Sequence, residues 1–335
     1  MKITLAGGLA AILLATTAIP AAADIQNRTI RISNGVQADH PVGNGVAKMQ
    51  ECIAERTDGA WTVNAFWGSA LGDDLEATQA LRSGTQEMVI TSTSPIVGIV
   101  PALGVFDLPF LFANEAEADA ILDGEFGDSI SELMLDSGLV NLAYWENGFR
   151  NLTNSQRPVE QAADLEGMRV RVMQNNIFLD TFASLGANAT PMAFGEVFSA
   201  LETGAIDAQE NPFVTIDTSQ FYEVQDYLSV TRHAYTPFMV LFSKPIWDRY
   251  SPEEQQILVD CAIEGRDVQR AVSRELSDQS LAKLQELGMQ VNELNDAAMA
   301  EIRERVAPVY ERHAATIGED VVERMQAALA ELRAE

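Results

Sequence analysis

The longest helical pattern in this chain runs from Ser251 to Gly288 and reads SPEEQQILVDCAIEGRDVQRAVSRELSDQSLAKLQELG. Ser251 and Glu254 form a capping box, and Pro252 takes the first helical position. At 1.5 Å per residue, one helix of this extent is about 55 Å long, which exceeds the usual diameter of a domain. We therefore expect it to run along both halves of a two-part molecule. A break into two helices near Gly265 is the alternative.

Two stretches of alternating strand and helix patterns precede this helix. The first has predicted strands at 28–34, 60–67 and 87–91 and predicted helices at 44–56 and 74–82. The second has predicted strands at 167–172 and 205–208 and predicted helices at 175–185 and 194–202. Because a strand–helix–strand order favours parallel pairing, both stretches predict α/β units.

Composition excludes several classes of partner and site. The 335 residues include 49 Asp and Glu but only 22 Lys and Arg, a formal net charge of −27. This charge repels nucleic-acid phosphates and anionic lipid headgroups. Two Cys and three His are too few for a disulfide scaffold or a His-rich metal site. Since the sequence also lacks the common catalytic and phosphate-binding motifs, we expect no catalytic residue, metal or cofactor.

The first 23 residues have the pattern of a secretion signal. Lys2 provides the positive charge, an apolar stretch follows at 3–19, and Ala21–Ala23 is a small-residue cleavage site. No later stretch reaches the roughly 18 to 20 apolar residues that a membrane helix needs. The sequence therefore predicts a soluble, exported protein that begins near Asp24 and does not insert into the membrane.

The two cysteines, Cys52 and Cys261, lie in different predicted helices. Export to an oxidising compartment allows a disulfide between them. Free cysteines are also among the residues most often found in protein cores. We expect two separate core thiols, with the disulfide as the alternative.

Polar side chains gather where the predicted strands end. Arg169 and Arg171 share one face of the strand at 167–172, and alternation alone does not say whether either is more than a surface residue. Gln174 and Asn175 follow this strand, and Asn211 follows the next one. Ligands of parallel sheets bind at the carboxyl ends of strands. Arginine suits a carboxylate and amides suit hydroxyls, so the pattern indicates a cleft for a hydroxylated anion.

Two further segments supply candidate residues. The stretch from Trp145 to Arg150 places an arginine after a glycine-containing turn and also offers Trp145 and Asn147. His40 follows the first predicted strand, where a structural loop residue is the more common interpretation. Carboxylates are numerous, but no spacing singles out an acid–base pair, so the sequence does not favour an enzyme.

Six motifs together resemble those of the periplasmic solute-binding proteins of tripartite ATP-independent periplasmic (TRAP) transporters, the DctP family. They are Val105–Phe112, Asn147–Asn154, Leu165–Val172, Leu185–Asn188, Ala200–Gly204 and Asp207–Pro212. The resemblance implies a two-lobed periplasmic binding protein fold that closes like a clamshell. Each lobe is then a sheet flanked by helices, with the long helix spanning both. One lobe would contain 24–147 and about 237–276, and the other 148–236 and about 277–335.

The resemblance also implies roles for single residues. Arg171 matches the arginine that pairs with the ligand carboxylate, Arg150 matches a second arginine on the ligand side, and Asn211 matches an asparagine that bonds the carboxylate. Arg169 stands where the family usually has lysine and should lie outside the site. The loop at 69–74 departs from the Gln-Leu-Gly often found there, which leaves the contacts of the first lobe open.

The segment after Arg171 looks like the branch of the family that handles hydroxylated sugar acids. A uronate would place its carboxylate at the arginines and its hydroxyls at the far end, near Gln174, Asn175, Asp73, Asp74 and His40. The resemblance implies membrane permease subunits as partners. A C4-dicarboxylate or a small sulfonate is the alternative ligand. A secreted carbohydrate-active enzyme and a ligand-sensing module are alternatives of other classes.

Overall fold

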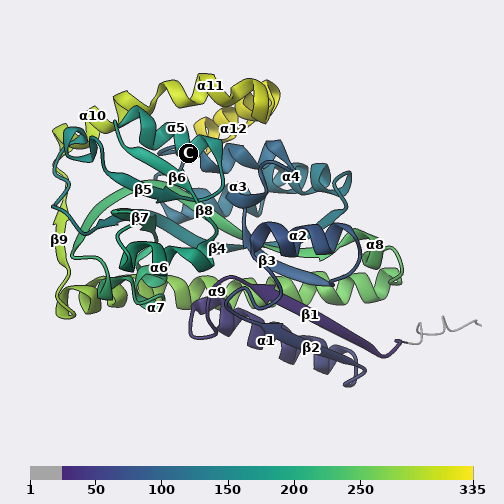
Figure 1. The fold of residues 1–335 in the computed structure, drawn as a ribbon. Helices are drawn as coiled ribbons and strands as arrows, with labels where there is room; N and C mark the ends of the chain where they lie inside the picture. The colour runs from purple at the N-terminus through teal and green to yellow at the C-terminus, as the bar shows by residue number, and fades with distance from the viewer. Residues whose placement is uncertain (1–24, 335) are drawn as a thin grey trace, which may run out of the picture.

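The computed structural model describes residues 25–334 as a mixed α/β protein in which helices flank one central sheet (Figure 1). The predicted signal segment, residues 1–23, lies outside the described residues. The strands are β1 (Arg28–Asn34), β2 (Trp61–Phe66), β3 (Met88–Ser92), β4 (Leu139–Asn154), β5 (Arg169–Val172), β6 (Asn188–Pro191), β7 (Ala208–Asn211), β8 (Tyr227–Ser243) and β9 (Gln290–Glu293).

Twelve α-helices and five short 3₁₀ helices connect these strands within the described range. The α-helices are α1 (Pro41–Arg56), α2 (Asp74–Arg82), α3 (Glu115–Leu122), α4 (Glu125–Leu135), α5 (Asn176–Ser184), α6 (Val197–Glu202), α7 (Phe213–Thr218), α8 (Lys244–Trp247), α9 (Pro252–Glu286), α10 (Asp296–Val306), α11 (Pro308–Ile317) and α12 (Glu319–Leu332). The 3₁₀ helices are η1 (Ser94–Ile96), η2 (Pro101–Asp107), η3 (Ala162–Leu165), η4 (Phe194–Glu196) and η5 (Phe221–Glu223). In residues 25–334, no helix combines the length and the apolarity that crossing a membrane requires.

The sheet has two parallel parts joined by two long antiparallel strands. Its order is β2-β1-β3-β8-β4-β7-β5-β6, with β9 beside β8. Strands β1, β2 and β3 pair in parallel, as do β5, β6 and β7, which confirms both predicted α/β units. Strands β4 and β8 run through both parts. The two separate sheets that the resemblance implied are therefore the two ends of a single continuous sheet. Almost every residue of these two strands is buried, so they lack the apolar–polar alternation that marks a half-exposed strand.

The long helix α9 is continuous, and the predicted alternative of a break near Gly265 is wrong. Gly265 lies where α9 passes α1. A Cβ atom there would meet Trp145 Cζ2 at 2.7 Å and the carbonyl oxygen of Gly45 at 2.8 Å. The Trp145 ring fills the space that the two glycines leave, and its indole nitrogen donates a hydrogen bond to the carbonyl of Ala262 at 2.9 Å. Gly265 thus permits close helix packing and does not end the helix.

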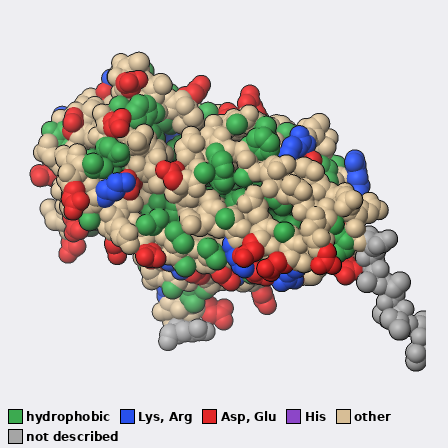
Figure 2. Space-filling view, turned by 90° about the horizontal axis from the view of Figure 1, so that it is seen from below, with side chains coloured by type: hydrophobic (Ala, Val, Ile, Leu, Met, Phe, Trp, Pro, Cys, Tyr) green, Lys and Arg blue, Asp and Glu red, His purple; other side chains and the backbone are tan. Residues whose placement is uncertain are grey.

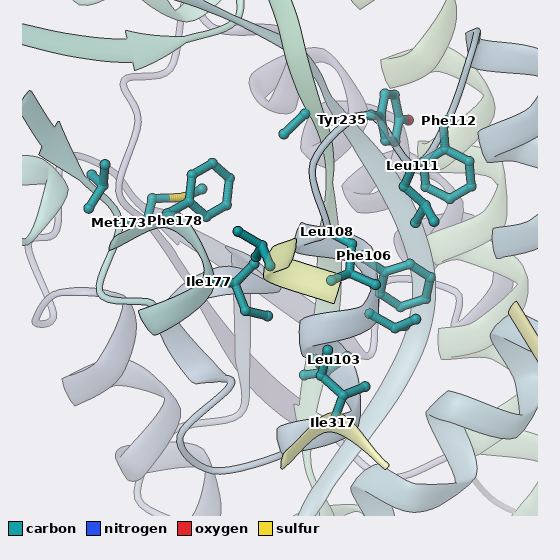
Figure 3. Close-up of a cluster of buried hydrophobic side chains, with 14 of the residues drawn as sticks. Leu103, Phe106, Leu108, Leu111, Phe112, Met173, Ile177, Phe178, Tyr235 and Ile317 are labelled. Atoms are coloured by element: carbon teal, nitrogen blue, oxygen red, sulfur yellow. The ribbon is translucent and has the colours of Figure 1, made fainter. Parts of the chain in front are cut away.

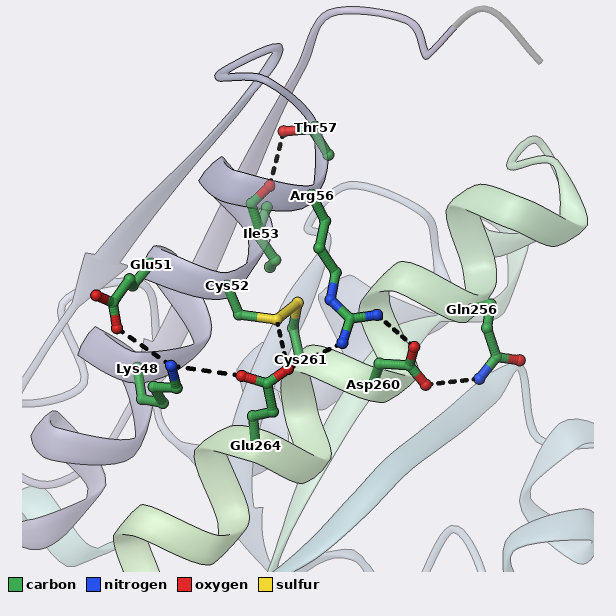
Figure 4. The surroundings of a disulfide bond; sticks show 10 residues. All are labelled: Lys48, Glu51, Cys52, Ile53, Arg56, Thr57, Gln256, Asp260, Cys261 and Glu264. Carbon is green, nitrogen blue, oxygen red and sulfur yellow. Dashed lines mark hydrogen bonds and ion pairs between the residues drawn. A yellow bond between two sulfur atoms is a disulfide. The ribbon is translucent and has the colours of Figure 1, made fainter. Parts of the chain in front are cut away.

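A disulfide joins Cys52 on α1 to Cys261 on α9, so the expectation of two free thiols is wrong (Figure 4). The two Cα atoms are 5.5 Å apart although 209 positions separate the residues. Beside the disulfide, Arg56 pairs with Asp260 and with Glu264. The first half of α9 is therefore fastened to α1 by a covalent bond, by ion pairs and by the packing around Trp145.

The largest hydrophobic cluster joins distant parts of the chain (Figure 3). Phe106 from η2, Ile177 and Phe178 from α5, and Ile317 from α11 lie together in it, and all are buried. A second cluster lies between α1, β1 and α9, and a third surrounds α6 and α7. The segment 94–112, which follows β3, therefore packs against α5, which follows β5, and against the C-terminal helices.

Candidate functional site

A narrow cavity of about 40 Å³ lies where strands from both parallel parts of the sheet end. Its walls come from the ends of β1, β3, β5 and β7, from the middle of β4 and β8, and from α2, η4 and α7. The lining residues are Asn34, Gly35, Val36, Asp74, Ser92, Asn147, Arg171, Met173, Phe194, Asn211, Thr215 and Phe238. Four of the predicted site residues meet here, namely Asp74, Asn147, Arg171 and Asn211.

Arg171 brings a buried positive charge to this cavity. Its Nε and Nη2 atoms donate to the carbonyl of Met192 at 3.0 and 2.6 Å, while Nη1 is buried with no hydrogen-bond partner in the described chain. Burial lowers the pKa of Arg171 to about 10, so the guanidinium stays charged at neutral pH. Arg169, on the same face of β5, is half exposed and pairs with Asp207. Of the two arginines, only Arg171 lines the cavity.

Acceptors and a hydroxyl line the same cavity as the guanidinium. Asp74, at the start of α2, lines the cavity, and burial raises the pKa of its carboxyl to about 6. Asn147 Oδ1 and Ser92 Oγ are buried without hydrogen-bond partners in the described chain, while Asn147 Nδ2 donates to Thr236 Oγ1 at 3.1 Å. The cavity therefore offers one unpaired cationic donor together with groups that accept hydrogen bonds from hydroxyls.

Arg150 lies behind the cavity and is already paired. Its Nη2 atom donates to Glu210 Oε1 at 2.8 Å and to Asn211 Oδ1 at 3.0 Å, and both side chains of the Arg150–Glu210 pair are fully buried. Burial opposes ionisation of Glu210, but the charge of Arg150 and a contact from His233 outweigh it and lower the pKa of Glu210 to about 2. Arg150 thus orients Asn211 from behind.

Three of the other predicted contacts serve the fold in this structure. Asn175 caps α5 by accepting from the amide of Ile177 at 2.6 Å, and its Nδ2 donates to Asp107 at 2.6 Å. Asp73 caps α2 in a capping box. Trp145 is fully buried between α1 and α9. Gln174 is half-buried and does not line the cavity.

His40 supports the cavity from one layer further out. It caps α1 by accepting from the amide of Val42 at Nδ1, so Nε2 is the ring nitrogen that donates to Thr215 Oγ1 at 3.2 Å. Burial lowers the pKa of His40 to about 3, which keeps the ring neutral. His40 therefore links the start of α1 to Thr215, a lining residue on α7.

Two buried carboxylates near the cavity, Glu210 and Asp107, were missed by sequence reasoning. Asp107 accepts hydrogen bonds from Ser94 and Asn175, and burial raises its pKa to about 7. Glu210 stands between the amide side chains of Gln209 and Asn211 in the motif Asp207–Pro212, which was a usable signal. Asp107 follows a phenylalanine in an apolar stretch, and a charge in such a position is a sign of a buried polar network. Within the described residues, no group of three or more His, Cys, Asp or Glu side chains is placed to hold a metal ion.

Comparisons with known proteins agree on one family. The family model described as bacterial extracellular solute-binding protein, family 7 (DctP), matches residues 32–316. The chain is 38% identical over 244 residues to the 2,3-diketo-L-gulonate-binding periplasmic protein YiaO of Escherichia coli (strain K12), covering 73% of this chain and 74% of that protein. It is 30% identical over 304 residues to the C4-dicarboxylate-binding periplasmic protein DctP of Rhodobacter capsulatus, covering 90% and 91%.

A solved structure gives the same result. The sugar acid binding protein DctPAm from Advenella mimigardefordensis strain DPN7T, crystallised in complex with galactonate, superimposes with a TM-score of 0.90. The two sequences are 43% identical, and the match covers 92% of this chain and 99% of that one. The predicted α/β fold and its long helix are therefore confirmed against an experimental structure.

Proposed function

We propose a ligand and a mode of capture for this chain, which belongs to the bacterial extracellular solute-binding proteins of family 7. Members of this family are solute-binding proteins and not enzymes. The proposed ligand is a sugar acid, such as a hexuronate, that the protein binds in the periplasm and delivers to the membrane permease of a TRAP transporter. One observation carries the proposal: Arg171 lines the cavity, and its buried Nη1 has no hydrogen-bond partner among residues 25–334.

The carboxylate of the ligand belongs at Arg171. A buried charge without a partner costs several kcal/mol, and an anion placed beside it removes much of that cost. Asn211, oriented by Arg150, lies in the same wall and presents its amide. On the face of the molecule seen in Figure 2, acidic side chains are more frequent than basic ones. A single buried guanidinium is therefore a strong local attraction for an anion in a protein of net charge −27.

The hydroxyls of the ligand belong at the acceptors. Asp74, Asn147 Oδ1 and Ser92 accept hydrogen bonds from hydroxyl groups, which a sugar acid supplies along its whole length. A C4-dicarboxylate would instead bring a second negative charge into the cavity that Asp74 lines. Like charges in a water-poor site repel, so this geometry favours the sugar acid over the dicarboxylate.

We place the hinge of the two proposed lobes where their boundaries meet. The boundaries after 147 and after 236 fall at a register shift, since Glu146 pairs with Pro237 but Gly148 pairs with Thr236. Gly148 has a φ of 115°, which suits glycine at a bend. On this account, a ligand that contacts both walls favours the closed form, and the permease recognises that form.

A ligand panel measured by thermal unfolding and calorimetry tests the proposal. We expect glucuronate, galacturonate or galactonate to stabilise the protein, by about 2.7 kcal/mol at a hundredfold excess over the dissociation constant. Neutral glucose should have no effect, and the recovered acid should be chemically unchanged. Preferential stabilisation by succinate would replace the proposed ligand class, and a lack of response to every acid would refute the proposal.

The affinity for the sugar acid is expected to depend on Asp74 and therefore on pH. With a pKa of about 6, Asp74 is ionised above pH 6 and protonated below it. The ionised form accepts hydrogen bonds at both oxygens, so the affinity should fall by about tenfold from about pH 7.5 to about pH 5. Calorimetry at the two pH values measures this change. In Asp74→Asn the affinity should be nearly independent of pH, and an equal pH dependence in this variant would exclude Asp74 as the cause.

A further inference from the structure

A second hollow, of about 330 Å³, adjoins the ligand cavity, and we refer to it as the outer hollow. Gly35, Val36 and Phe194 line both spaces, so the two meet across these residues. The other walls of the outer hollow include Gln37, Gly195, Phe198, Gln220 and Phe221. Its volume falls in the range of about 300–1,000 Å³ that is usual for small-molecule sites.

The walls of the outer hollow have the chemistry of a sugar-binding surface. Phe194 and Phe198 offer aromatic rings to the C–H face of a sugar, while the buried Phe221 packs edge-on against Phe194. Gln37 and Gln220 offer amide groups that both donate and accept, as sugar hydroxyls require. No charged side chain lines this hollow among the described residues. It therefore suits an uncharged polyol ring better than a second carboxylate.

The border between the two spaces lies beside Asp74, at the end of the cavity where we place the hydroxyl groups of the ligand. A Cβ atom built on Gly35 would lie 3.6 Å from Asp74 Oδ1 and 3.9 Å from Phe194 Cδ1, which places the Asp74 carboxylate beside this border. Ser69 Oγ lies 3.7 Å from the same Cβ position, so a side chain at residue 35 would fill the space at this border. A ligand whose carboxylate is bound at Arg171 and whose hydroxyls reach Asp74 thus points its far end at the outer hollow.

We propose that the outer hollow is a subsite for a second sugar residue, joined to the acid through one of its hydroxyl groups, as in a 4-O-glycosyl sugar acid. The protein then binds acidic disaccharides as well as single sugar acids. This inference rests on the proposed function, because it needs the carboxylate to be bound at Arg171. It adds a substrate class in which the acid lies in the inner cavity and the neutral residue lies against the phenylalanine rings.

Calorimetry with three related compounds tests the inference. Lactobionate is gluconate that carries a galactosyl residue, so gluconate is its control without the second sugar and lactose is its control without the carboxylate. We expect lactobionate to bind at least as tightly as gluconate, and lactose to show no binding. If gluconate binds but lactobionate binds at least tenfold more weakly, the subsite does not exist while the proposed function stands. If no sugar acid binds at all, the proposed function fails and the subsite with it.

A substitution that fills the outer hollow provides the second test. Gly195 lines it, and a Cβ atom there would have Ser69 Oγ at 4.0 Å as its nearest neighbour, so the backbone leaves room for a side chain in Gly195→Leu. We expect this variant to lower the affinity for lactobionate at least tenfold more than the affinity for gluconate. Gly98→Leu is the matched control, since nothing lies within 4 Å of a Cβ atom at Gly98 and Gly98 lines neither space. An unchanged ratio of the two affinities in Gly195→Leu would overturn the inference.

Discussion

Arg171→Ala is expected to weaken the binding of a sugar acid by about thirtyfold or more. Truncating one partner of a buried, hydrogen-bonded charge pair costs about 2–5 kcal/mol, and each 1.4 kcal/mol is a factor of ten in affinity. The side chain is 2% exposed, so little water is available to replace the guanidinium beside the ligand. Calorimetry with the acid that the wild-type protein binds best measures the loss.

The neighbouring arginine supplies a matched control for this experiment. Arg169 lies on the same strand and the same face, but its side chain is 47% exposed and is paired with Asp207. Arg169→Ala removes the same charge from the same strand and should change the affinity by less than about twofold, as expected for a solvent-exposed ion pair. Equal losses in the two variants would mean that net charge, and not the cavity, governs binding.

Removing the disulfide with the double substitution Cys52→Ala and Cys261→Ala should lower the free energy of unfolding by about 2–5 kcal/mol. The bond joins residues 209 positions apart, so its loss frees a very long loop in the unfolded chain. Urea unfolding followed by circular dichroism measures the change. Affinity for the ligand should be retained, because neither cysteine lines the cavity.

Counting free thiols distinguishes the loss of the disulfide from a loss of side-chain packing at the two cysteines. The wild-type protein, unfolded without reductant, should show no free thiol, whereas the same protein unfolded with reductant should show both. Reduced wild-type protein should unfold with nearly the same free energy as the double variant. Detection of two free thiols in the unreduced protein would contradict the pairing of Cys52 with Cys261.

The sequence pattern predicted those helices and strands that are determined by residues close together in the sequence. The capping box at Ser251 and the proline after it set the start of α9, and alternation revealed β1, β2 and β5. Strands β4 and β8 were missed because they are buried on both faces and have no period to detect. Gly265 suggested a bend because its actual neighbour, the ring of Trp145, is 120 positions away in sequence.

In the candidate site too, features set by nearby residues could be predicted, whereas contacts between residues far apart in the sequence could not. Strand ends can be predicted from sequence, and Arg171 and Asn211 do line the cavity. Pairing cannot be predicted in this way, because Arg150 meets Glu210 across 60 positions. Short polar residues at strand ends also serve as helix caps, and Asn175 and Asp73 have that role here. The sequence pattern for a ligand contact and the pattern for a cap are therefore the same.

Three connections cross between the two parallel parts of the sheet: β4, β8 and α9. Near its far end, α9 is held to α7 by an ion pair between Lys283 and Asp217. Two domains joined by a single linker can translate and rotate relative to each other in several directions. Three connections side by side restrict this motion to bending about a single hinge axis. For the opening and closing proposed above, we therefore expect every molecule to follow the same path in both directions, so that bringing the walls together again requires no search among orientations.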